Sequence, residues 1–134
     1  MVHIVLVEDD LDDVYFFKMA CETLPQKPDI TILNDGTKLI EYLETNNGAN
    51  KIILLDLNMP KLGGFEVLKK LNELGKINQL LIVTYTTSDN EEDIEAAYQL
   101  GVKSYLTKPD NLEELSALVS TISEYWFKYN TTPN

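Results

Sequence analysis

Short apolar runs alternate with longer amphipathic stretches along the chain. The apolar runs are rich in Val, Ile and Leu, and most are almost continuously apolar, as is typical of strands buried on both faces of a parallel sheet. This pattern predicts five strands, at His3–Val7, Ile30–Leu33, Ile52–Leu55, Leu80–Tyr85 and Val102–Thr107.

A segment with helical spacing of apolar residues follows each predicted strand. The first two helices are expected at about Asp12–Leu24 and Thr37–Glu44, and Pro25 ends the first of them. The third follows the Gly63–Gly64 turn, and the fourth, with Ile94, Ala97 and Tyr98 on its apolar stripe, stops at Gly101. The fifth carries apolar positions at Leu112, Leu115, Val119, Ile122 and Trp126 and continues to Tyr129.

Five strand–helix units predict an α/β fold, a doubly wound five-stranded parallel sheet with right-handed crossovers. We expect the strand order 2-1-3-4-5 of a flavodoxin-like (βα)5 sandwich. One domain is expected over residues 1–128, followed by a flexible polar tail at 129–134. Ligands of such sheets bind beyond the carboxyl ends of the strands, so the chemistry is expected there.

Composition narrows the function classes. The 134 residues include 22 acidic and 11 basic residues, for a net charge of −11, which repels a nucleic-acid backbone and predicts no nucleic-acid partner. The apolar runs are far shorter than the ~20 residues of a membrane span, and no secretion signal opens the chain. We therefore expect a cytoplasmic protein without a membrane partner, in which the single cysteine, Cys21, is a core residue.

Acidic residues crowd the end of the first predicted strand, where Glu8, Asp9 and Asp10 are soon followed by Asp12 and Asp13. Like charges this close require protonation, solvent or a bound cation, and hard carboxylate oxygens suit Mg²⁺. For these acids alone, the simpler interpretation is a solvated loop in which Asp12 caps the first helix.

Other strand ends favour a site over a plain loop. Asp56 follows the third strand, Thr86 lies near the end of the fourth, and Lys108 follows the fifth. In the expected strand order these side chains lie at the same edge as Glu8 and Asp9. A carboxylate nucleophile, a metal-binding acid group, a hydroxyl and an ammonium are the groups that phosphoryl transfer to a carboxylate requires.

Four motifs in this sequence resemble the receiver domain of two-component response regulators, and the resemblance covers nearly the whole chain. The motifs are Val5–Asp10, Leu55–Pro60 with Gly63–Gly64, Tyr85–Ser88 and Tyr105–Pro109. Their spacing matches the family and selects Thr86 over its neighbours Thr84 and Thr87.

The resemblance implies that Asp56 accepts a phosphoryl group from a phosphohistidine of a sensor histidine kinase. It also implies an Mg²⁺ ion held by Glu8, Asp9, Asp56 and the backbone carbonyl of Asn58. Lys108 and Thr86 would contact the phosphoryl oxygens. The protein would signal and would not act as an enzyme.

The resemblance further implies a conformational switch and a cis Lys108–Pro109 bond. Tyr105 would move with Thr86 and alter the surface of the fourth helix, fifth strand and fifth helix. Because the chain stops soon after the fifth helix, we expect no output domain and an output through protein contacts.

One expected contact is a homodimer, formed either through that surface or through C-terminal aromatic side chains, namely Tyr125, Trp126, Phe127 and Tyr129. The loop after Thr86 and the aromatic ending also resemble the single-domain regulators that accompany bacterial phytochrome kinases. A phytochrome-like kinase is therefore the expected partner.

Three alternatives compete with this interpretation. A Mg²⁺-dependent phosphatase with an aspartate nucleophile requires a second Asp two residues later, where this chain has Asn58. A flavin-binding electron carrier requires a hydroxyl- and glycine-rich loop after the first strand, where this chain has acids. The third alternative, a receiver that only binds partners and no longer switches, is disfavoured by the presence of Asp56, Thr86 and Lys108 together.

Overall fold

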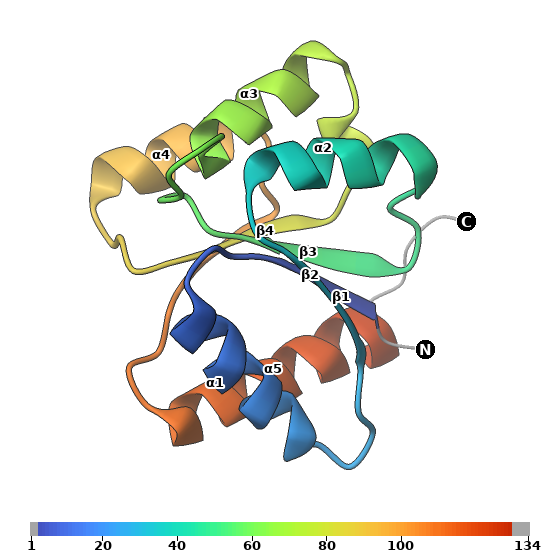
Figure 1. Ribbon diagram of the computed structural model, residues 1–134, viewed down its shortest axis with the longest axis vertical. Helices are drawn as coiled ribbons and strands as arrows, with labels where there is room; N and C mark the ends of the chain where they lie inside the picture. Colours follow the sequence, from blue (N-terminus) through green and yellow to red (C-terminus); the bar gives the residue numbers. More distant parts are fainter. Residues whose placement is uncertain (1–2, 130–134) are drawn as a thin grey trace.

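The computed structural model of the protein describes residues 3–129 and alternates strands with helices (Figure 1). Its elements are β1 (His3–Val7), α1 (Leu11–Glu22), β2 (Asp29–Leu33), α2 (Gly36–Thr45), β3 (Lys51–Leu55), α3 (Gly64–Glu73), β4 (Ile82–Thr86), α4 (Glu91–Gln99), β5 (Ser104–Thr107) and α5 (Leu112–Glu124). A 3₁₀ turn at Ile77–Gln79 precedes β4, and a π-helical turn at Tyr125–Tyr129 follows α5. No helix in this part of the chain is long and apolar enough to cross a membrane.

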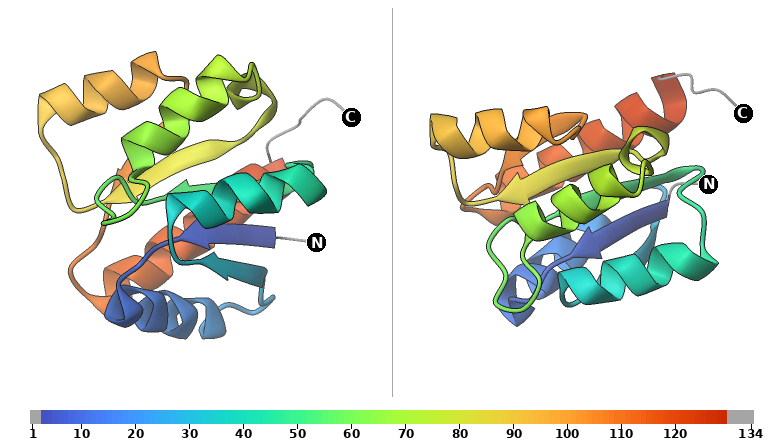
Figure 2. Two further views of the ribbon diagram at one scale, coloured as in Figure 1. Left: turned by 45° about the horizontal axis from the view of Figure 1, so that its top comes forward. Right: turned by 90° about the horizontal axis from the view of Figure 1, so that it is seen from above.

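The strands form one parallel sheet in the order β2-β1-β3-β4-β5, which confirms the predicted fold. Helices α2, α3 and α4 cover one face, and α1 and α5 cover the other (Figure 1). The arrowheads of the strands point toward one side of the molecule (Figure 2). The carboxyl ends of all five strands therefore meet at one edge.

Strand periodicity divides the core into two layers. Val5 and Val7 pack with the side chains below α2 and α3, whereas Ile4 and Leu6 pack with those of α1 and α5. Since neighbouring parallel strands are in register, Ile53 and Leu55 join the first layer and continue the same alternation. Both faces of the central strands are thus buried, which is why they read as continuous apolar runs.

Strands β2 and β3 each start one residue before the predicted position, and two strand starts and one helix cap differ more clearly from the predictions. Strand β4 starts at Ile82, because Leu80 closes the preceding 3₁₀ turn, and β5 starts at Ser104. Asp10 caps α1 with a carboxylate that accepts hydrogen bonds from the amides of Asp12 and Asp13. The simpler interpretation of these acids, in which Asp12 is the cap, is therefore wrong, because Asp12 lies within the first turn.

The aromatic end of the chain is divided between core and surface. Trp126 and Phe127 pack against the α1–α5 layer, whereas Tyr125 and Tyr129 are 52% and 64% exposed. On α4, Tyr98 is exposed, so its predicted place on the apolar stripe was wrong. The last five residues of the predicted tail, 130–134, lie outside the described part of the chain.

Candidate functional site

The predicted site residues Glu8, Asp56 and Lys108 each come one position after a strand. Their backbone amides still donate hydrogen bonds to the neighbouring strand, so the sheet fixes their positions. The bonds run from Glu8 N to Leu33 O (2.9 Å), from Asp56 N to Val7 O (3.2 Å) and from Lys108 N to Thr86 O (2.8 Å).

Glu8, Asp9 and Asp56 form an acidic cluster whose carboxylate oxygens lie within 4.8 Å of one another. Glu8 is 1% exposed and Asp56 5% exposed, so two of the three charges are screened from water. Burial and, to a smaller extent, the charge of Asp56 raise the pKa of Glu8 to about 7, against the opposing effect of Lys108. Three hard oxygen donors this close fit a divalent cation.

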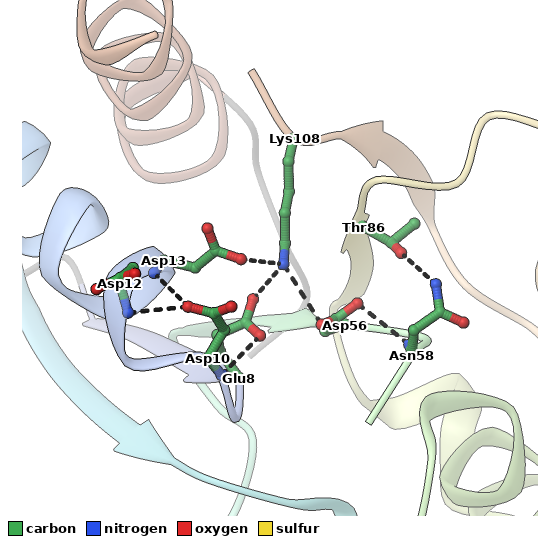
Figure 3. Close-up of polar contacts among 8 residues, drawn as sticks. All are labelled: Glu8, Asp10, Asp12, Asp13, Asp56, Asn58, Thr86 and Lys108. Carbon is green, nitrogen blue, oxygen red and sulfur yellow. Dashed lines mark hydrogen bonds and ion pairs between the residues drawn. The ribbon is translucent and has the colours of Figure 1, made fainter. Parts of the chain in front are cut away.

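Lys108 is the counter-ion of this cluster (Figure 3). Its ammonium lies 2.5 Å from Glu8 Oε1, 2.7 Å from Asp13 Oδ2 and 3.4 Å from Asp56 Oδ2. Burial opposes the charge, but the hydrogen bonds with Asp13 and Glu8 outweigh it and raise the pKa of Lys108 above its ordinary value. Lys108 is therefore positively charged at neutral pH and lies beside the predicted phosphoacceptor.

Asp13 is the member of this group to which the sequence assigned no role. It lies three residues after the Asp10 cap, and a side chain in the first helical turn points back toward the helix N-terminus. That spacing was the available signal, but it could be used only with the correct cap. With the helix expected to begin at about Asp12, the direction of the Asp13 side chain could not be predicted.

Asn58 connects Asp56 to Thr86. The Asn58 backbone amide donates to Asp56 Oδ1 (3.2 Å), and its side-chain amide lies 3.5 Å from Thr86 Oγ1 (Figure 3). Asn58, the acidic cluster and Lys108 line one cavity of about 250 Å³. Thr86 is fully buried behind this cavity, and the exposed hydroxyl residue in its lining is Thr87.

Tyr105 lies on β5, outside the acidic pocket. Its ring packs against the core layer below α2 and α3, and its hydroxyl donates to the backbone carbonyl of Ser88 (2.9 Å). This hydrogen bond ties β5 to the loop after β4, which begins beside Thr86. The predicted switch residues Thr86 and Tyr105 are therefore both connected to that loop, Thr86 through the chain and Tyr105 through the hydrogen bond to Ser88.

The peptide bond before Pro109 is trans, as are all the peptide bonds within residues 3–129. The cis bond that the resemblance implied is therefore not found. The trans isomer is the ordinary preference of an X–Pro bond, by about 0.5–1 kcal/mol. Lys108 reaches the acidic cluster from this trans backbone.

The turn after Asp56 depends on close backbone packing at the start of α3. A Cβ atom on Gly64 would lie 2.5 Å from the Asp56 carbonyl oxygen and 2.7 Å from Leu57 Cα. Such distances are shorter than non-bonded atoms allow, so only glycine lets α3 start this close to Asp56. At the neighbouring Gly63 a Cβ would meet nothing closer than 3.5 Å.

Comparisons with known proteins agree with this geometry. The family model of the response regulator receiver domain matches residues 4–120. Response regulator Rcp1 of Synechocystis sp. is 36% identical over 135 residues, which cover 97% of this chain and 92% of Rcp1.

Solved structures give the same result. The Mn²⁺-bound form of Rcp1 superposes with a TM-score of 0.81 at 34% identity and covers 100% of both chains. The phosphorylated cyanobacterial phytochrome response regulator RcpA superposes with a TM-score of 0.84 at 33% identity and covers 99% of both. The chain therefore belongs to the family of response regulator receiver domains, the phosphorylated signalling components of two-component systems.

Proposed function

We propose that Asp56 is the phosphoacceptor of this receiver domain. The observation that carries the proposal is that one carboxylate at a fixed strand end meets two further acids and a buried ammonium in one open cavity. Asp56 Oδ1 accepts a hydrogen bond from the backbone amide of Asn58, and Asp56 Oδ2 faces the Lys108 ammonium. The carboxylate is thereby held in one orientation with an oxygen directed into the cavity.

The reaction is transfer of a phosphoryl group from a phosphohistidine nitrogen to an Asp56 oxygen. The N–P bond breaks and an O–P bond forms, which gives an acyl phosphate and a free imidazole. Lys108 stabilises the incoming negative charge, and Thr86 donates a hydrogen bond to a phosphoryl oxygen.

The metal of this reaction would be Mg²⁺, and Glu8, Asp9, Asp56 and the backbone carbonyl of Asn58 would hold it. The donor set supports it, since all four ligands are hard oxygens and three of them already lie within 4.8 Å of one another. When bound, the cation would neutralise charge between the carboxylates and the phosphoryl group. Rcp1 has been solved with Mn²⁺, which accepts the same kind of ligand.

The output is a change at the surface of α4, β5 and α5. Phosphorylation adds about −1.5 to −2 charge beside Thr86 and draws that residue and its loop toward Asp56. Because the Tyr105 hydroxyl is bound to Ser88 in the same loop, the movement reaches β5. This contact supports Tyr105 as the residue that moves with Thr86.

The partner is a sensor histidine kinase of the phytochrome type, by the likeness to RcpA. A second copy of the chain is the other partner, bound through the α4–β5–α5 surface or through the C-terminal aromatic residues. Exposed Tyr98 on α4 supports the first surface, and exposed Tyr125 and Tyr129 support the second.

Acetyl phosphate tests the proposal without a kinase. The wild type, incubated with acetyl phosphate and Mg²⁺, is expected to gain one phosphoryl adduct by intact-mass measurement, and a chelator is expected to prevent it. Asp56→Asn should gain none, whereas Asp12→Asn, which removes a charge outside the acidic cluster, should behave as wild type. An equal adduct on Asp56→Asn would refute the assignment, and continuous release of phosphate from phosphate esters would favour a phosphatase.

A further inference from the structure

Lys108 has a third carboxylate partner, Asp13, that the proposed reaction does not use. An ammonium group has three N–H donors, and Lys108 faces three carboxylates, those of Glu8, Asp13 and Asp56. Of these contacts, the one to Asp13 is a hydrogen bond of 2.7 Å, shorter than that to Asp56. A phosphoryl oxygen can therefore accept a hydrogen bond from Lys108 only if one of these three carboxylates shares its hydrogen bond or gives it up.

The three partners differ in what a cation would do to them. Glu8 and Asp56 belong to the acidic cluster, so a bound cation compensates their charge when Lys108 moves away. Asp13 lies outside that cluster, on the first turn of α1, and its side chain is 38% exposed. The contact between Asp13 and Lys108 is thus the one that a cation in the cluster leaves in place.

Asp13 also lies where it can act on the phosphoryl group. It lines the cavity that holds Asp56 and Lys108, and together with Lys108 it lines a second cavity of about 320 Å³ between α1 and the start of α5. The Asp13–Lys108 pair therefore stands at the boundary of the reaction cavity. The negative charge of Asp13 faces the Lys108 ammonium, the same group that the phosphoryl oxygens would contact.

We propose that Asp13 is a positioning residue that competes with the phosphoryl group for the Lys108 ammonium. In the unmodified protein, Asp13 holds Lys108 at the edge of the pocket. After phosphoryl transfer, Lys108 has to exchange this contact for a phosphoryl oxygen, so the strength of the pair sets how tightly the phosphorylated state is held. This inference rests on the proposed role of Asp56 and adds a residue that affects how tightly the phosphoryl group on Asp56 is held.

The expected effect is a gain in binding when the carboxylate is removed. Asp13→Asn and Asp13→Ser free Lys108, and because the lost contact is partly solvated, binding of a phosphoryl mimic should tighten by roughly three- to tenfold. Asp13→Glu keeps the charge and should remain near wild type.

Beryllium trifluoride with Mg²⁺, titrated calorimetrically, is the probe, because its complex with a carboxylate mimics an acyl phosphate. The matched control is Asp12→Asn, which makes the same change of charge one residue away and has no contact with Lys108 among residues 3–129. Its affinity should equal that of wild type. ¹⁵N resonances of the lysine ammonium groups give a second readout, in which the Lys108 signal should shift in metal-free Asp13→Asn and stay in place in Asp12→Asn.

Unchanged or weaker binding by Asp13→Asn would overturn the proposal. An equal gain in Asp12→Asn would also overturn it, since the effect would then be one of general charge. The underlying assignment is tested separately by Asp56→Asn, which should not bind the mimic. If that variant bound like wild type, the phosphoacceptor proposal would fail whatever the result at Asp13.

Discussion

Glu8 is a site residue whose acid–base chemistry is strongly altered by the fold. It lies at the end of a buried strand, and its neighbours are two acids and one lysine. Burial favours the neutral carboxyl, and the result is a pKa of about 7 in place of the ordinary 4.5. A cation that binds in the cluster near neutral pH would therefore displace a proton from Glu8.

The first prediction concerns stability and pH. Since the folded pKa of Glu8 is raised, the folded state binds a proton that the unfolded state has lost between pH 4.5 and 7. The contribution of Glu8 to the metal-free stability is therefore present below about pH 4.5 and is lost as pH rises through 7. Mg²⁺ binds the ionised form, so the rise in Tm that Mg²⁺ causes should increase from pH 6 to pH 8.

Thermal unfolding at several pH values, with Mg²⁺ or with a chelator, checks this prediction. Glu8→Gln removes the titrating group, so its Mg²⁺-dependent rise in Tm should be smaller and flatter with pH. A wild-type rise that is constant between pH 6 and pH 8 would contradict the role given to Glu8.

The positions of individual site residues could be predicted from the sequence where the residue directly follows a strand. Glu8, Asp56 and Lys108 could be placed because each directly follows an apolar run, and parallel strands bring their carboxyl ends together. Asp13 was missed because its direction depends on where α1 begins. The direction of a side chain in the first turn of a helix depends on the exact start of the helix, and the expected start was about Asp12, one residue after the observed start.

The turn between β3 and α3 is the element that ties the phosphoacceptor to a helix. Gly64 begins α3 against the backbone of Asp56, whereas Gly63, in an ordinary extended conformation, has room for a side chain. Two adjacent glycines thus have different roles. One is required by packing, and the other can be replaced without a clash.

Gly64→Ala is predicted to push α3 away from the end of β3. Overpacking of this kind costs about 1–3 kcal/mol in the free energy of unfolding, measured by urea denaturation. Phosphorylation by acetyl phosphate should also slow, because the carbonyl of Asp56 has to move. Gly63→Ala is the matched control and should leave both quantities close to wild type; similar losses in the two variants would contradict the packing argument.

The strands and helices were predictable to within a few residues because burial on both faces leaves a strong apolar signal. The differences occur where local hydrogen bonding decides the boundary. Leu80 belongs to the apolar run before β4, yet it closes a 3₁₀ turn. The π-helical turn at Tyr125–Tyr129 has no counterpart in the helical spacing, since its apolar residues fit an α-helix equally well.

The molecule combines a large net negative charge with a buried positive charge, that of Lys108, at the site. The acidic residues behind the net charge of −11 are of two kinds: a small cluster at the site, Glu8, Asp9 and Asp56, and acids elsewhere in the chain. Exposed aromatic side chains lie on α1, on α4 and after α5. The aromatic side chains on α4 and after α5 lie at the two surfaces proposed to contact a second copy.

Sedimentation velocity tests the proposed homodimer. With Mg²⁺ and beryllium trifluoride, the wild type should sediment as a dimer, and either Tyr98→Ser or Tyr125→Ser should remain monomeric and so identify the surface. Tyr15→Ser, which removes an exposed aromatic side chain on α1, is the control. A monomeric wild type, or dimers in both variants, would contradict the proposed interfaces.

The most direct test of the central claim is to locate the phosphoryl group in the chain. Borohydride reduces an aspartyl phosphate to homoserine, so peptide mass spectrometry after phosphorylation and reduction identifies the modified residue. The account predicts homoserine at position 56, dependent on Mg²⁺ during phosphorylation. Modification at Asp9, Asp13 or any other carboxylate, with position 56 unchanged, would contradict it.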